Sequence, residues 1–140
     1  MTALVQKREP LRAWELGTIK NSLGILSKDR SKFKPEKFAL LTGLGKSELE
    51  KITGISRPQF YKKEILLKPG SKILKRIVSV VIAADLAFEL FGENKEETSS
   101  WLMAPNAILF GDTPFEVCMR GEGEKLIEWL NQRLGNLGTI

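Results

Sequence analysis

The stretch KPGSKILKRIVSVVIAADLAFELFG, residues 68–92, decides how the rest of the chain is interpreted. After the helix-breaking pair Pro-Gly near its start, apolar residues recur on most faces of a helix from Ser71 to about Phe91. The valines and isoleucines would also suit a strand, but about twenty residues are too many for one. Gly92 ends the helix. We therefore expect a fold built around one long helix.

A helix that is apolar nearly all round lies either in the centre of a molecule or at the interface of a dimer. The apolar residues of this helix exceed what one neighbouring helix can cover. We therefore expect a homodimer with Val78, Val81 or Ile82 near its interface.

Shorter helices are predicted on both sides of the long one, which makes the fold class all-α. One helix begins at Pro35 and stops at Gly43, and others follow the long helix at roughly 95–103, 105–109, 114–119 and 123–134. The first 34 residues show only a weak helical period, in part through Trp14 and Leu16, and are expected to form a loosely docked helix or tail. The expected division is a basic N-terminal segment (1–34), a helix-turn-helix module (35–70) and a carboxyl-terminal region (71–140).

The net charge of +5 conceals a division along the chain. Residues 1–76 hold 18 Lys or Arg and 7 Asp or Glu, a net +11, whereas residues 77–140 hold 4 and 10, a net −6. A basic half suits a polyanion such as nucleic acid, and an acidic half would be repelled by one.

The segment GKSELEKITGISRPQFYKKE, residues 45–64, has the pattern of two short helices joined across Gly54. Ser47 is expected to cap the first helix in a capping box with Glu50, and Ser56 to cap the second. Phe60 would then point inward, and the second helix would present to DNA Arg57, Gln59, Tyr61, Lys62 and Lys63.

Two residues depart from the usual helix-turn-helix pattern. Glu50 occupies a position that usually holds a small residue, and Lys63 a position that usually holds Ile or Leu. Both departures indicate altered helix packing, and an αα-hairpin that only packs remains the alternative.

The sequence offers little to catalysis. It contains no histidine, so the usual Ser-His and Cys-His nucleophiles and imidazole metal ligands are absent. The single cysteine, Cys118, lies in an apolar stretch and is expected to be a buried core thiol. We expect no enzyme, no cofactor and no membrane span, and a cytoplasmic protein.

The stretch PNAILFGDTPFEV, residues 105–117, contains a turn with a glycine, a carboxylate and a hydroxyl. An Asp or Thr before proline caps the helix that the proline opens, so Gly111, Asp112 and Pro114 are expected to position helices rather than to react.

These residues also carry a resemblance to a family. Trp101, Pro105-Asn106, FGDTPFEV at 110–117 and GEGEKLIEWLNQRL at 121–134 resemble the C-terminal toxin-binding domain of Xre/MbcA/ParS antitoxins. The long helix resembles the element that joins this domain to the family's Xre-like helix-turn-helix. The resemblance covers roughly residues 45–134.

The resemblance implies an antitoxin of a type II toxin–antitoxin system that neutralises a NAD-consuming RES-domain toxin by direct binding and represses its own operon by binding operator DNA. By this resemblance Gly111, Pro114 and Gly123 shape the domain. The expected toxin contacts are Trp101, Asn106, Arg133, Gly135, Asn136 and Leu137. The alternative is a stand-alone helix-turn-helix transcriptional regulator without a toxin, and an adjacent reading frame for a RES-domain protein would separate the two.

Overall fold

The computed structural model describes residues 19–66 and 68–139, the last four of these by their backbone alone. Helices dominate this part of the chain, which confirms the all-α class apart from one two-stranded sheet. The elements are, in order, β1 (Lys32–Phe33), α3 (Pro35–Thr42), α4 (Lys46–Thr53), the 3-10 helix η2 (Arg57–Tyr61), β2 (Ile65–Leu66), α5 (Lys72–Leu90), α6 (Lys95–Met103), the 3-10 helix η3 (Ala107–Leu109), α7 (Pro114–Met119) and α8 (Gly123–Thr139).

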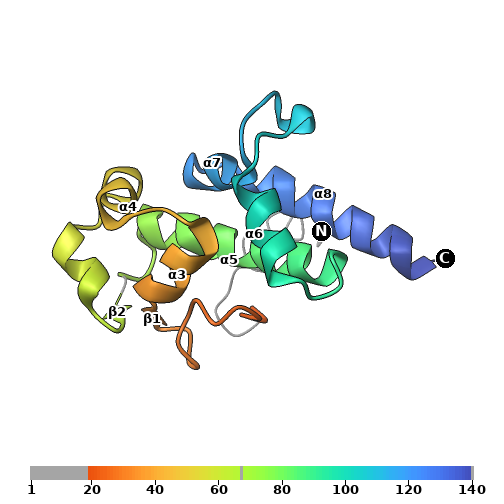
Figure 1. The fold of residues 1–140 in the computed structure, drawn as a ribbon. Coiled ribbons are helices and arrows are strands. Elements are labelled where there is room, and N and C mark those ends of the chain that lie inside the picture. The colour runs from red at the N-terminus through yellow and green to blue at the C-terminus, as the bar shows by residue number, and fades with distance from the viewer. Residues whose placement is uncertain (1–18, 67, 140) are drawn as a thin grey trace, which may run out of the picture.

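The long helix is α5, and it forms the centre of the molecule (Figure 1). It begins after Ser71, whose hydroxyl accepts a hydrogen bond from the Leu74 N–H at 3.2 Å. Helices α6, α7 and α8 all pack against it, with α8 making the most extensive contact. Val78 and Val81 are consequently buried within one chain, whereas Ile82 is half-buried. Several helices, rather than one, cover α5, so its apolar faces do not require a second copy of the chain, and the homodimer stays a prediction.

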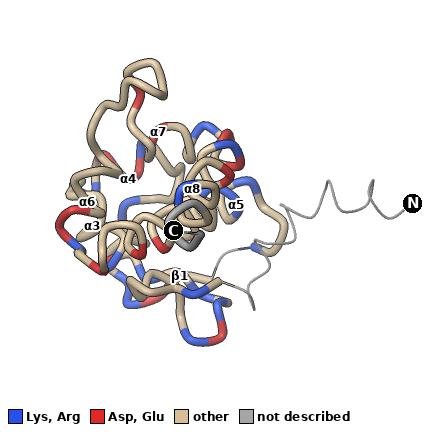
Figure 2. Tube along the Cα trace, turned by 90° about the vertical axis from the view of Figure 1, so that its right-hand side faces the viewer, with Lys and Arg blue, Asp and Glu red and all other residues tan. Residues whose placement is uncertain are grey.

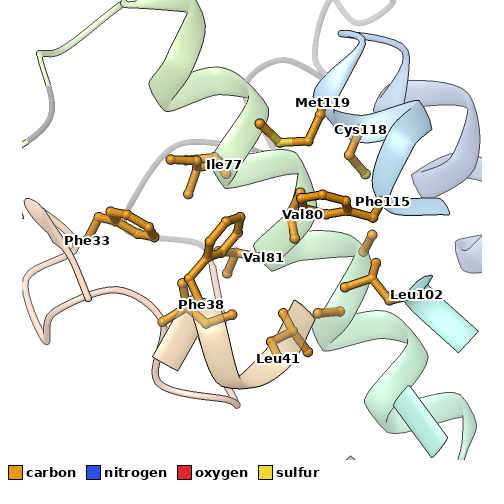
Figure 3. Packing of buried hydrophobic residues seen from close by; sticks show 14 of the residues in the cluster. Phe33, Phe38, Leu41, Ile77, Val80, Val81, Leu102, Phe115, Cys118 and Met119 are labelled. Carbon is orange, nitrogen blue, oxygen red and sulfur yellow. The ribbon is translucent and has the colours of Figure 1, made fainter. Parts of the chain in front are cut away.

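The core continues from α5 to elements on both sides of it in the sequence (Figure 3). Phe38 of α3 contacts Phe33 of β1 and Phe115 of α7, with ring centroids 5.1 and 5.9 Å apart. Cys118 is fully buried in this core, as expected. Burial raises the pKa of its thiol to about 12, so the thiol stays protonated.

Residues 19–34 pack closely against α5, so the expected loose docking does not hold for this part of the N-terminal segment. Ile25, Leu26 and Phe33 are buried. The carboxylate of Asp85 on α5 accepts hydrogen bonds from the N–H groups of Asn21 (2.9 Å) and Ser22 (2.8 Å). Antiparallel pairing of β1 with β2 adds a second attachment. Trp14 and Leu16 lie outside the described residues.

The last helix is longer than predicted. It begins at Gly123, as expected, but continues past the predicted end at Leu134 to Thr139. Its first residue lies against α5 so closely that a Cβ on Gly123 would be 2.9 Å from the Cβ of Ser79. No helix in the described ranges has both the length and the apolar content needed to cross a bilayer.

Candidate functional sites

The connection between α6 and α7 forms a loop that projects from the body of the molecule (Figure 1). Asn106 holds both ends of this loop. Its side-chain oxygen accepts a hydrogen bond from the Ile108 N–H at 2.9 Å, its own N–H donates to the Asp112 carbonyl at 3.0 Å, and its carbonyl accepts from the Gly111 N–H at 2.9 Å. The loop is therefore closed on itself by hydrogen bonds and does not need a partner to keep its shape.

At the end of this loop, Phe110 is 97% exposed and Ile108 is 56% exposed. Phe110 has a left-handed backbone conformation with φ +58°, which is uncommon for a residue other than glycine. Residues 104–111 carry no charge, and the loop stands out as an uncharged projection in Figure 2. An ordered, uncharged loop that exposes two large apolar side chains is typical of a protein-binding surface.

A groove of about 340 Å³ lies between this loop and α8. Leu109, Val117 and Leu126 form its apolar part, and Trp129 of α8 also contributes to it. The guanidinium of Arg133 lies 4.8 Å from the centre of the Trp129 ring, a cation–π contact. We call the loop, its two exposed side chains and this groove the Phe110 surface.

The turn at 111–114 connects the loop to the start of α7. Gly111 has φ +91°, and the hydroxyl of Thr113, rather than the carboxylate of Asp112, caps α7 by accepting from the Glu116 N–H at 3.0 Å. Asp112 instead pairs with Arg120 at 3.0 Å. The hydrogen bond from Arg120 to Glu122, together with the pairing with Asp112, raises the pKa of the Arg120 guanidinium.

Of the expected toxin contacts, Asn106 lines the groove beside the loop. Trp101 does not line it; it is half-buried, and its ring packs against Phe91 in a T-shaped arrangement with the ring centroids 6.2 Å apart. Gly135 is exposed on α8, whereas Asn136 and Leu137 are described by their helical backbone alone. Arg133 contacts the ring of Trp129, which lines the groove.

Sequence reasoning missed Ile108, Phe110 and Trp129 as surface residues. The sequence did contain one indication of this surface. Phe110 stands directly before a turn glycine and belongs to no helical or strand pattern of apolar residues, so nothing in the sequence places it in a core.

The expected recognition helix differs most from the structure. Residues 57–61 form a 3-10 helix of five residues, and Lys62 and Lys63 lie beyond its end. The expected caps are also absent: α4 begins after Gly45, whose N–H donates to the Glu48 carboxylate at 3.3 Å, and the Ser56 side chain makes no cap hydrogen bond. Phe60 does point inward, as predicted.

Glu50 of α4 holds the start of η2 in place across the turn between them. One carboxylate oxygen of Glu50 accepts from the Arg57 N–H at 2.9 Å, and the other lies 3.5 Å from the Arg57 guanidinium. The acid that departs from the usual helix-turn-helix pattern therefore connects the two elements. Of the five expected DNA contacts, Arg57 is engaged by this acid, Gln59 is half-buried, and Tyr61, Lys62 and Lys63 are exposed.

Comparison with known proteins identifies no family for this chain. No family model, curated protein or solved structure matches it significantly.

Proposed function

We propose that this chain is the antitoxin of a type II toxin–antitoxin pair and neutralises a RES-domain toxin by direct binding. The observation that carries the proposal is the exposed side chain of Phe110, presented on an ordered loop beside an apolar groove. The loop belongs to the segment that resembles the toxin-binding domain of Xre/MbcA/ParS antitoxins. The proposal thus combines a sequence resemblance with a surface suited to binding protein.

The order of the loop supports a binding role. Hydrogen bonds around Asn106 hold the loop in one conformation, so a partner would not have to fix it on binding. Preorganisation of this kind reduces the conformational entropy lost in association. A large aromatic side chain that enters a pocket of the partner is the usual energetic centre of a protein interface.

The charge of the carboxyl half also supports the proposal. Residues 77–140 carry a net −6, which suits a basic partner surface, such as one that admits the phosphates of a dinucleotide. Arg133 and Trp129 would extend the contact along α8, since their cation–π pair borders the groove.

The expected repression of an operon is not part of this proposal. Reading base pairs in the major groove usually requires an α-helix that presents several side chains, and the element at 57–61 is a short 3-10 helix. A stand-alone transcriptional regulator remains the alternative function, and binding to a specific duplex sequence without any toxin partner would favour it.

The test is inhibition of a RES-domain toxin, taken from an adjacent reading frame if one is found there, with NAD consumption measured as the chain is titrated in. Phe110→Ala removes a side chain that is 97% exposed, so the melting temperature should not change. Loss of a central aromatic anchor should weaken inhibition by about 2 kcal/mol, or roughly 30-fold.

Leu66→Thr is the matched control, because Leu66 is also a large exposed apolar residue, at 71%, but lies on β2 away from the Phe110 surface. It should inhibit like the unaltered chain. Equal inhibition by Phe110→Ala and Leu66→Thr would remove the basis of the proposal.

A further inference from the structure

A second, wider groove lies between α3 and η2, with a volume of about 670 Å³. We call it the α3–η2 groove, and its principal residues are Leu40, Leu44, Lys46, Tyr61, Lys62 and Lys63. It is separate from the Phe110 surface, with which it shares no lining residue.

The basic side chains of this groove are available for phosphate groups. Among the described residues, Lys46, Lys62 and Lys63 form no ion pair. Nearby acids are engaged elsewhere: Glu64 lies 4.0 Å from Lys32, and Glu50 pairs with Arg57. Glu36 is the acidic residue on the groove itself, so three ammonium groups face one carboxylate.

Tyr61 supplies an aromatic platform in the same groove. Its side chain is 73% exposed, and the ammonium of Lys46 lies 4.7 Å from its ring centroid. The neighbouring Phe60 is buried and anchors η2, which fixes the position from which Tyr61 extends. An exposed aromatic ring flanked by lysines is the arrangement by which proteins stack a base and neutralise the adjoining phosphates.

The geometry favours a single strand over a duplex. A base can stack on an aromatic side chain only when it is not already stacked between neighbouring bases in a double helix. The alternative, reading of base edges by η2, is disfavoured because five residues of 3-10 helix span only about 10 Å and Arg57 is held by Glu50. We propose that the α3–η2 groove binds single-stranded nucleic acid, with a base stacked on Tyr61 and phosphates on Lys46, Lys62 and Lys63.

The test is fluorescence anisotropy of labelled oligo(dU) and oligo(U) of twelve nucleotides, and of a twelve-base-pair duplex, at two salt concentrations. Both single strands are expected to bind more tightly than the duplex, and the tighter of the two identifies the sugar that the groove prefers. Tyr61→Ala should weaken single-strand binding roughly 5- to 100-fold, whereas Tyr61→Phe, which keeps the ring, should stay within about twofold.

The lysines are tested separately. Lys62→Gln combined with Lys63→Gln should reduce the slope of log affinity against log salt by about 1.4, the value for two fewer phosphate contacts to a single strand. Lys51→Gln, on the exposed face of α4 and outside the groove, is the control and should change the slope less. Duplex binding at least as tight as single-strand binding, or an unchanged affinity in Tyr61→Ala, would overturn the proposal. Toxin neutralisation is a separate measurement on a separate surface, so failure here leaves the antitoxin proposal untouched.

Discussion

Replacing Gly123 with alanine tests the closest approach between two helices in the core. The added methyl group would lie 2.9 Å from both Cβ and Oγ of Ser79 and 3.3 Å from Sγ of Cys118. Non-bonded carbon atoms prefer separations of about 3.5–4.0 Å, so α8 and α5 would have to move apart by roughly half an ångström. Ser79 and Cys118 are both buried and cannot turn toward solvent.

Overpacking of this kind costs about 1–3 kcal/mol. For a domain somewhat below 150 residues, each kcal/mol lowers the melting temperature by about 3–4 °C, so Gly123→Ala should melt roughly 3–12 °C lower. The measurement is thermal unfolding followed by circular dichroism at one protein concentration.

Gly135→Ala is the matched control, since Gly135 lies in the same helix with no atom within 4 Å of the added Cβ. There alanine should raise stability by about 0.5–1 kcal/mol through its helix propensity. The same substitution should therefore have opposite signs at two positions of α8. A Gly123→Ala variant that melts at or above the temperature of the unaltered chain would refute the close approach.

Three further substitutions test other parts of the structure. Gly111→Val should lower the free energy of unfolding by about 1 kcal/mol or more in urea titration, because φ of +91° disfavours a β-branched side chain even though the space around it is open. Asp85→Ala leaves two backbone N–H groups without their acceptor and should cost about 2 kcal/mol, with faster hydrogen exchange at residues 21 and 22. The pKa of the Cys118 thiol is raised from 9.0 to about 12, so the native state keeps a proton that the unfolded chain loses in this range. The unfolding free energy should therefore be unaffected by this group below pH 9 and should fall above it, by up to about 1.4 kcal/mol per pH unit, and Cys118→Ala should remove this part of the decline.

The helices that sequence patterns predicted well have a clear start signal, such as a capping hydroxyl or a proline in the first turn. Ser71 caps α5 and Thr113 caps α7. Each of these two helices begins directly after the residue whose hydroxyl accepts a hydrogen bond from a backbone N–H of its first turn. The predicted helix after Ser56 had a serine and a proline at its start but only Phe60 to bury. The position one turn later is Glu64, which is only half-buried, so no apolar stripe extended the helix and a single 3-10 turn formed.

The N-terminal segment and the candidate sites depended on contacts that no local pattern contains. Asp85 binds residues 21 and 22 across more than sixty positions of sequence. Likewise, the role of Asn106 follows from the hydrogen bonds that close its loop, and the exposure of Phe110 follows from that closure. The sequence resemblance located the segment but did not distinguish the residues that hold the loop from those that it exposes.

The charge division along the chain has a physical consequence for the two proposed binding surfaces. The α3–η2 groove lies toward the α3–α4 end of the molecule, whereas the loop that carries Phe110 projects from the body between α6 and α7 (Figure 1). A basic protein approaching the chain is attracted by the acidic carboxyl half and repelled by the lysines of the groove, whereas a nucleic acid experiences the opposite forces. Under the two proposals, this difference would favour a basic protein at the carboxyl half and a nucleic acid at the α3–η2 groove. Because the loop itself is uncharged, its apolar side chains would add affinity for a protein partner without changing this electrostatic difference between the two proposed partners.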